Sequence, residues 1–327
     1  MKVETKNILV TGGAGFIGSQ VAIALQDKYD VTVLDNFYWN EKLMRKNLKG
    51  FEGNIIKADL RDYNFDKLKN KPDAIVHKKL IRNLQRPNVI IHGVAITDTT
   101  VKDSKLIIDV NFRAFKKILD YAEKNGVDVV YASSASVYGN RKVPMKESQK
   151  PQLLSFYAES KWLMDRLVLD KIKNSKIKIV GLRYFNVYGP GEGHKGKMAS
   201  MILQLYKQMK QKKRPRIFHD GNQTRDFVYI KDVVNATILA MDTKRSGIYN
   251  VGSGKSISFN KVIQVLNKNM GTSYKPEYIM NNPYTHFQES TLADLSLAKR
   301  FLKYEPNYSI ERGIMEYVKI LEGENGK

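Results

Sequence analysis

The sequence predicts an α/β fold, in which a doubly wound parallel sheet is joined to a smaller C-terminal domain. Short apolar stretches alternate with longer helical patterns through the first half of the chain, which is typical of a parallel sheet covered by helices on both faces. A glycine-rich stretch at residues 12–18 follows the first apolar stretch directly. An acidic residue, Asp35, ends the second. Together these observations place the first half of the chain in one sheet.

The apolar stretches locate the strands, and apolar residues recurring every three to four positions locate the helices. We expect strands at residues 8–11, 31–34, 54–57, 88–92, 127–132 and 177–182. We expect helices at residues 19–28, at residues 105–124 and from about Ser155. Gly126 stands where it would end the second helix. Residues 225–232 and 247–252 are expected to return to the main sheet.

Two apolar stretches, at residues 73–77 and 88–92, compete for the fourth strand. We assign the strand to residues 88–92, because they lead directly into Gly93 and the polar stretch after it. The basic stretch at residues 78–86 is then additional material for which the sequence indicates no purpose.

Cysteine is absent and the five histidines are scattered, which argues against thiol and metal chemistry. The chain has no disulfide, no cysteine-ligated metal and no thiol nucleophile. No two histidines have the spacing of a helical metal site, so no metal is expected. No apolar run approaches the ~18 residues that cross a bilayer, and the chain does not open like a signal peptide. We therefore expect a cytoplasmic protein without a membrane partner.

The formal net charge of +22 raises the alternative of nucleic-acid binding. The lysines are spread along the whole chain, and many fall on the polar faces of expected helices. The densest basic run, residues 207–216, ends a helix, where cations suit the helix dipole. We therefore expect no nucleic-acid partner. A positive field still favours anionic substrates such as nucleotide diphosphates.

The glycine stretch predicts a Rossmann-type site for a dinucleotide. Gly12 and Gly15 permit a tight turn and a close approach of pyrophosphate to the backbone, and Gly18 permits close packing of helix on sheet. The start of the helix that follows offers N–H donors and a positive dipole end. The alternative is a turn that needs glycine for packing alone.

The choice between NAD and NADP stays open from these residues. Asp35 favours NAD, because an acid at the end of the second strand hydrogen-bonds ribose hydroxyls and repels a 2′-phosphate. Asn36 follows it, and Lys42, Arg45 and Lys46 come shortly after. Those cations can hold a 2′-phosphate despite the acid.

Tyr157 and Lys161 are four residues apart and therefore lie on one face of a helix. Our hypothesis is that the Lys161 cation, with a positive nicotinamide ring, lowers the pKa of Tyr157 so that its phenolate accepts a hydroxyl proton. Ser134, at the end of the fifth expected strand, would hydrogen-bond the same oxygen. The alternative is a solvent-facing pair on a helix surface.

With these elements in this order, the chain resembles the extended short-chain dehydrogenase/reductase family, and within it the nucleotide-sugar epimerases. Residues 183–200, which include the run Gly-His-Lys-Gly-Lys-Met-Ala-Ser, resemble those of ADP-L-glycero-D-manno-heptose 6-epimerases. Supporting stretches lie at residues 97–100, 131–134, 225–229 and 282–284. The resemblance implies epimerisation at C6 of an ADP-heptose, with NADP as cofactor and a role in the inner core of lipopolysaccharide. It also implies a homo-oligomer, with a pentamer as the expected form.

The resemblance assigns residues to three tasks. Ser134, Tyr157 and Lys161 are the expected catalytic residues, joined by Lys195 as a second acid/base; the alternative for Lys195 is an ordinary lysine in a glycine-rich loop. The expected cofactor residues are Gly12, Gly15, Phe16, Ile17, Gly18, Asp35, Asn36, Lys42, Asp59, Leu60, Gly93, Val94, Ala95, Ile96, Thr97, Asn111, Tyr157, Lys161, Val187 and Lys195. The expected substrate residues are Asn186, Lys197, Gln204, Phe218, Arg225 and Tyr284.

Arg225 suits a diphosphate, and its alternative is a salt bridge with Asp226 or Asp232. Lys197 and Gln204 stand where some relatives have serine and histidine, which leaves GDP-heptose and UDP-hexose open as substrates. Outside enzymes, the alternative is a dinucleotide-sensing, RNA-associated protein. We expect residues 1–182 and 222–254 to form the dinucleotide-binding domain, and residues 183–221 and 255–327 to form the substrate-binding domain.

Overall fold

The computed structural model describes residues 6–69, 86–98, 101–280 and 288–325. The chain divides into two compact units. The first unit comprises residues 1–134, 155–183 and 237–249, and the second comprises residues 135–154, 184–236 and 250–327. The predicted division assigned residues 135–154 and 222–236 to the dinucleotide-binding domain, whereas in the structure they group with the second unit.

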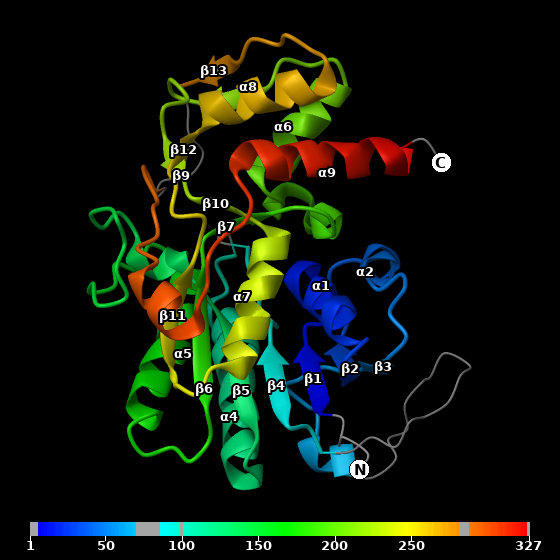
Figure 1. Ribbon diagram of the computed structural model, residues 1–327, viewed down its shortest axis with the longest axis vertical. Helices are drawn as coiled ribbons and strands as arrows, with labels where there is room; N and C mark the ends of the chain where they lie inside the picture. The colour runs from blue at the N-terminus through cyan, green and yellow to red at the C-terminus, as the bar shows by residue number, and fades with distance from the viewer. Residues whose placement is uncertain (1–5, 70–85, 99–100, 281–287, 326–327) are drawn as a thin grey trace. The chain divides into compact units, whose positions relative to one another are not determined.

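A seven-stranded parallel sheet forms the centre of the fold (Figure 1). Its strands are β1 (Asn7–Thr11), β2 (Asp30–Asp35), β3 (Asn54–Lys57), β4 (Val89–His92), β5 (Asp128–Ser134), β6 (Ile179–Tyr184) and β11 (Gly247–Val251). Their order across the sheet is β11-β6-β5-β4-β1-β2-β3. Helices flank the sheet, which confirms the predicted α/β, Rossmann-type class.

The order of the strands reverses between β1 and β4. From β1 the chain builds outward through β2 to β3, and then returns to place β4 on the other side of β1. In the parallel register Val10 lies opposite both Val33 and Ile91. Open sheets of this kind bind ligands beyond the carboxyl ends of the strands at such a reversal. The segments after β1 and β4 are therefore the ones that position a ligand.

The helices of the first unit bury one face each against the sheet. Helix α1 (Phe16–Leu25) packs on β1 and β2, while α4 (Ala114–Asn125) and α5 (Phe156–Lys171) pack on β5. Phe115 and Leu119 of α4 and Val168 of α5 are fully buried in the shared core. That burial stabilises the unit, since each such side chain contributes roughly 1.5–3 kcal/mol on leaving water.

The predicted long helix at residues 105–124 consists of three consecutive pieces. It begins as α3 (Ser104–Ile107), widens into a π-helical segment at Ile108–Arg113, and continues as α4. Gly126 ends α4 in the left-handed conformation, with φ of 66°, and its N–H bonds the Ala122 carbonyl. The predicted stop at Gly126 is confirmed. π-Helical turns inside helices are frequent at functional sites.

The second unit contains short strands and three long helices. The strands are β7 (Asn186–Tyr188), β8 (Arg216–Phe218), β9 (Thr224–Arg225), β10 (Phe227–Tyr229), β12 (Ile257–Ser258) and β13 (Glu277–Ile279). The helices are α6 (Met201–Lys210), α8 (Phe259–Met270) and α9 (Ile310–Asn325). Helix α7 (Ile230–Asp242) begins in this unit and ends in the first.

Two stretches were expected to return to the main sheet, and one of these predictions is wrong while the other is confirmed. Residues 225–232 do not join the main sheet, because β9 pairs with β12 and β10 pairs with β7. Residues 247–252 do join it through β11. The fourth strand is β4, as predicted, while residues 73–77 and most of the basic stretch at 78–86 lie outside the described residues. Within the described ranges, no helix combines the length and the apolar character that a bilayer crossing requires.

Candidate active site

The glycine loop brings the segments after β1 and β4 into direct contact. Gly12 has φ of 70°, and a Cβ there would lie 2.8 Å from the Gly93 carbonyl carbon. A Cβ at Gly18 would lie 2.3 Å from the Gly12 oxygen, so helix α1 approaches the loop as closely as glycine allows. At Gly15 the nearest described atom is the Gly12 oxygen at 3.2 Å, and no side chain caps α1. The backbone at this helix start therefore fits a pyrophosphate.

Asp35 is buried, and it ties the end of β2 to the glycine loop. One carboxylate oxygen accepts a hydrogen bond from the Ala14 N–H at 3.0 Å, and the other accepts one from the Phe37 N–H at 2.8 Å. Burial raises the pKa of Asp35, and these two bonds oppose the rise. This structural task was missed in the sequence, and the contact of Asp35 with a ribose stays a prediction.

Some of the cations near Asp35 are paired with an acid and others are not. Arg45 and Lys57 both pair with Glu41 on α2 (Glu41–Asn47), each at 2.7 Å. Lys42 is exposed, and among the described residues its ammonium has no hydrogen-bond or ion-pair partner. The Asn36 side-chain amide donates a hydrogen bond to the Asp59 carboxylate at 3.0 Å, and this bond fixes its orientation. Lys46 is exposed and likewise unpaired among the described residues, so Lys42 and Lys46 are the cations of this segment that no acid holds.

Asp59 and Leu60 follow β3 and fix this end of the sheet. The Arg61 side chain bonds Asp59 and lowers the pKa of that carboxyl to about 2. Leu60 is buried in the core of the first unit. Both residues stay predictions as cofactor contacts.

Asn111 is fully buried in the π-helical segment and holds the stretch after β4. Its Oδ1 accepts a bond from the Ile96 N–H at 2.8 Å, and its Nδ2 donates to the Ile96 oxygen at 3.1 Å and to the Ser160 hydroxyl at 2.9 Å. One amide therefore fixes the predicted cofactor segment 93–97 to helix α5. Asn111 acts on that segment through Ile96.

Ser134, Tyr157 and Lys161 come together in the first unit. Ser134 ends β5, and its side chain hydrogen-bonds Tyr157. Lys161 donates to the Ala132 oxygen at 2.7 Å, and its ammonium lies 5.9 Å from the centre of the Tyr157 ring. The three side chains that the sequence grouped as catalytic are therefore neighbours. Ser134 comes from the end of β5, and Tyr157 and Lys161 come from one face of α5.

The expected lowering of the Tyr157 pKa by Lys161 together with a positive nicotinamide ring stays a prediction. Burial is the largest influence and raises the pKa of Tyr157, against which the bond from Ser134 acts. Burial also lowers the pKa of Lys161 to about 8, and Asp165 opposes that shift. Both groups are thus biased toward their neutral forms by loss of water.

A buried ion pair between Asp165 and Arg183, which the sequence interpretation missed, lies next to Lys161, and the charge of Asp165 acts on the Lys161 ammonium. Asp165 accepts hydrogen bonds from the Arg183 guanidinium at 2.8 Å and from the Tyr131 hydroxyl at 2.9 Å. The Asp165 and Arg183 side chains are 0% and 2% exposed. Asp165 stands four residues after Lys161, so the spacing alone could have indicated it.

His92 at the end of β4 is also part of this buried region. Its Nδ1 lies 2.8 Å from the Thr11 hydroxyl, and its ring stacks on Phe115 with centres 5.3 Å apart. Burial lowers the pKa of His92 to about 3, with a further contribution from Lys161. The imidazole is therefore neutral and structural near pH 7.

In the second unit, Glu192 closes the segment that carries Lys195. The buried carboxylate accepts hydrogen bonds from the Gly189 N–H at 3.2 Å, from the Ser200 hydroxyl at 2.8 Å and from the Ser200 N–H. Burial lowers the pKa of Lys195, while the charge of Glu192 raises it. The chain turns at Gly196, with φ of 55°, directly after Lys195. Lys195 is therefore a half-buried amine in a loop with both ends fixed.

Arg225 lies in the second unit without an acidic partner among the described residues. It donates to the Thr224 oxygen at 2.8 Å, and its guanidinium stands 5.6 Å from the centre of the Phe259 ring. Asp226 and Asp232 bond other groups, including the backbone N–H of Gly254 and of Asn307. Burial lowers the pKa of Arg225 to about 10. The alternative of a structural salt bridge is therefore not found within the described chain.

The other predicted substrate residues are placed in the same unit. The Asn186 Oδ1 accepts a bond from Thr291 at 3.2 Å, and Gln204 donates to the Lys197 and Ala199 oxygens. Lys197 is exposed, and Phe218 ends β8 half-buried. Val187 lies beside Asn186 in β7. Tyr284 lies outside the described residues, and these assignments stay predictions.

The sheet, the glycine loop and the Ser134–Tyr157–Lys161 group of the first unit are arranged as is typical of enzymes that bind a dinucleotide. Comparison with known proteins then identifies the class. Residues 8–252 match the family model described as the NAD dependent epimerase/dehydratase family. The chain belongs to this family, and it is an isomerase of the nucleotide-sugar epimerase class.

Solved structures agree with the assignment. An ADP-L-glycero-D-manno-heptose-6-epimerase from Helicobacter pylori is 36% identical, with 98% of this chain and 97% of that chain covered and a TM-score of 0.87. A UDP-N-acetylglucosamine 4-epimerase from Methanobrevibacter ruminantium, in complex with UDP-N-acetylmuramic acid, is 28% identical, with 98% and 100% covered and a TM-score of 0.87. A UDP-glucuronic acid 4-epimerase from Bacillus cereus, in complex with UDP-glucuronic acid and NAD, is 30% identical, with 96% and 99% covered and a TM-score of 0.82.

Proposed function

We propose that the protein inverts C6 of ADP-D-glycero-D-manno-heptose to give ADP-L-glycero-D-manno-heptose through a transient 6-keto sugar, with NADP as cofactor. Such a product belongs to the inner core of lipopolysaccharide. The observation that carries the proposal is Lys195, a half-buried amine whose segment is closed by Glu192 and Ser200. The 36% identity to a heptose 6-epimerase supports the choice of substrate.

The first unit supplies one set of reacting groups. When bound, the nicotinamide dinucleotide would take up and return hydride at C6. The glycine loop and the N-terminus of α1 would hold its pyrophosphate. Tyr157 would accept the proton of the C6 hydroxyl, Ser134 would hydrogen-bond the same oxygen, and Lys161 would stabilise the phenolate with its charge.

Lys195 would serve as the second acid/base. Inversion requires hydride to leave one face of the carbon and return to the other, so the oxygen of the turned ketone needs a proton donor in a new position. Burial lowers the pKa of Lys195, which makes the amine a better proton-transfer group near neutral pH. This role would account for the half-buried position of the Lys195 side chain.

Arg225 would bind the diphosphate. Its guanidinium is largely removed from water and has no carboxylate partner in the described part of the chain, so a bound anion would compensate its charge. A diphosphate is common to ADP-, GDP- and UDP-sugars. The test of the proposal must therefore distinguish the nucleotide as well as the sugar.

Proton NMR tests the proposal with the protein as purified. ADP-D-glycero-D-manno-heptose, GDP-D-glycero-D-manno-heptose and UDP-glucose are incubated separately, without added cofactor. We expect inversion at C6 of the ADP-heptose at a rate at least tenfold above any change in the other two. Equal or faster turnover of another nucleotide sugar would overturn the proposed substrate.

The variant Lys195→Met tests the second acid/base in the same assay. We expect epimerisation to fall at least about a hundredfold, the lower end of what general acid/base groups contribute. Lys197→Met, two residues along the same segment, is the matched variant and should lower the rate far less. Wild-type epimerisation by Lys195→Met would remove Lys195 from the mechanism.

A further inference from the structure

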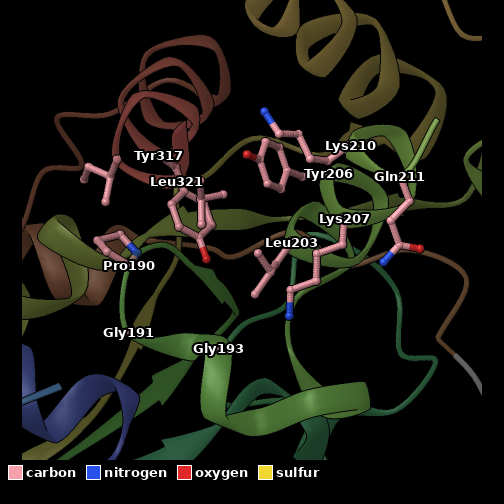
Figure 2. Close-up of a pocket in the computed structure, with 11 residues that line it drawn as sticks. Pro190, Gly191, Gly193, Leu203, Tyr206, Lys207, Lys210, Gln211, Tyr317 and Leu321 are labelled. Carbon is pink, nitrogen blue, oxygen red and sulfur yellow. The ribbon is translucent and has the colours of Figure 1, made fainter. Parts of the chain in front are cut away.

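The second unit contains a cavity of about 330 Å³ that none of the predicted site residues lines. It lies between helices α6 and α9, and the segment after β7 forms its third wall. Figure 2 shows Tyr317 and Leu321 of α9 opposite Leu203 and Lys207 of α6. The volume is within the range of small-molecule sites, which begins at roughly 300 Å³.

The two helices are joined at one end of this cavity by Glu322. Its carboxylate accepts a hydrogen bond from the Tyr206 hydroxyl at 2.7 Å and pairs with the Lys210 ammonium. Glu322 therefore fixes α9 on α6 and compensates the charge of Lys210. At this end of the cavity, the charge of Lys210 is therefore balanced by Glu322.

At the other end one positive charge is not balanced. Lys207 is exposed, and within the described chain its ammonium has neither a hydrogen bond nor an ion pair; no acidic residue is among those that line the cavity. In Figure 2 the ammonium groups of Lys207 and Lys210 point in opposite directions, and the Gln211 amide lies on the side of Lys207. Ile320 and Leu321, both half-buried, supply apolar surface to the cavity, because Leu203 is almost completely buried.

We infer that this cavity is a second ligand site, for an organic anion with an apolar body. Lys207 would pair with the anionic group, and the Gln211 amide would donate to it. The body would pack on Ile320 and Leu321, as small ligands commonly do in apolar pockets. The two ends of the cavity thus match the two ends of such a molecule.

The position of the cavity indicates an effector site, a conclusion that rests on the proposed function. Gly191 and Gly193 line it, and they flank Glu192 in the segment that carries Lys195. Gly191 and Gly196 both have positive φ, at 100° and 55°, where glycine moves between conformations at low cost. A ligand packed on Gly191 and Gly193 restricts this segment. Because Lys195 must exchange protons on a ketone that turns, the restriction slows turnover.

Fluorescence titration with anilinonaphthalene sulfonate tests the site, using protein saturated with NADP so that the dinucleotide site is filled. We expect one binding site per chain, weakened about tenfold in Lys207→Ala, the loss expected for one charge-assisted contact. Ile320→Trp, which narrows the cavity, should abolish this binding. Lys213→Ala removes an exposed lysine that does not line the cavity and should bind like wild type.

Each outcome decides a separate claim. Equal affinity in Lys207→Ala and wild type, or equal weakening in Lys213→Ala, overturns the site, whatever reaction the enzyme catalyses. If the probe binds as expected, its saturation should lower kcat at least twofold in wild type, and about tenfold more probe should be needed for the same loss in Lys207→Ala. An unchanged kcat with the cavity filled overturns the effector role. Lack of turnover on ADP-heptose overturns only the proposed function.

Discussion

Lys161 and Tyr157 lie four residues apart on α5, and burial moves their pKa values in opposite directions. At pH 7 a lysine with a pKa of about 8 is still mostly charged, whereas the phenol of Tyr157 is neutral. Ser134 and Asp165 act against burial, the first on Tyr157 and the second on Lys161. The proton affinities of the pair are therefore set by four residues and not by two.

His92 should make the protein sensitive to acid. Its pKa is about 3 in the folded chain against 6.5 when exposed, so its contribution to stability is complete above pH 6.5 and is lost as the pH falls toward 3. In that window we expect the free energy of unfolding to fall by about 1.4 kcal/mol per pH unit from this group. Urea denaturation between pH 7 and about 4.5 measures the slope.

The variant His92→Asn keeps a polar partner for Thr11 but cannot take up this proton. We expect its stability to depend less steeply on pH below 6.5 than that of wild type. His219→Asn, in the second unit, is the matched control and should keep the wild-type slope. Identical slopes in His92→Asn and wild type would contradict the assignment of His92 as a neutral buried group.

Lys42 should decide the preference between the two dinucleotides. Glu41 holds Arg45 and Lys57, which leaves Lys42 and Lys46 unpaired in the described chain, and we expect Lys42, the one nearer to Asp35 in the sequence, to meet a 2′-phosphate. We expect Lys42→Glu to weaken NADP at least about tenfold, as loss of a charge-assisted contact does, and to change NAD by less than about threefold. Calorimetric titration of both dinucleotides measures the ratio, with Lys49→Glu as an exposed control. Equal losses for NADP and NAD would contradict a role of Lys42 at the 2′-phosphate.

The candidate site residues could be picked out from the sequence more easily than the residues that support them. Tyr157 and Lys161 are four residues apart on one helix, so their local spacing alone makes them neighbours. Thr11 and His92 lie far apart in sequence and meet only because β1 and β4 are neighbours. Pairing of that kind depends on strand order, which no local pattern contains.

Among the helices, α5 carries both the candidate catalytic pair, Tyr157 and Lys161, and the buried carboxylate of Asp165. The Asp165–Arg183 pair joins α5 to the end of β6 and is removed from water on both sides. Breaking a buried pair leaves the partner charged without compensation. The pair therefore fixes the helix that presents Tyr157 and Lys161.

Asp165→Asn should destabilise the protein strongly. We expect a loss of about 3–5 kcal/mol in the free energy of unfolding, because Arg183 would stay buried without an anion. Asp170→Asn, on the same helix, removes an exposed partner of Lys173 and should cost less than about 1 kcal/mol. Urea denaturation compares the two variants. A loss below about 1 kcal/mol in Asp165→Asn would contradict the supporting role of this pair.

Element prediction succeeded where periodicity is strong and failed where pairing is not local. The strands of the first sheet and the stop of α4 at Gly126 agree with the structure. Residues 225–229 end in a short run of aromatic and β-branched residues that is typical of a strand, yet they pair with β12 and β7 in the second unit. Such a run indicates that a stretch is a strand and does not indicate which sheet it joins.

At the scale of the whole molecule, the two units contribute different predicted functions. The first unit holds the dinucleotide loop and the Ser134–Tyr157–Lys161 group, and the second holds Lys195 and Arg225. The residues that we expect to act with the dinucleotide are therefore in the first unit. The residues that we expect to select the sugar nucleotide and the position of inversion are in the second.

The central claim is that C6 is inverted by hydride transfer on one bound cofactor, with proton transfer confined to oxygen. Incubation with ADP-D-glycero-D-manno-heptose in deuterium oxide, followed by proton NMR, tests it directly. The account predicts inversion at C6 with the original hydrogen retained on that carbon, because hydride does not exchange with solvent. Deuterium at C6 of the product, or no inversion at C6, would contradict the account.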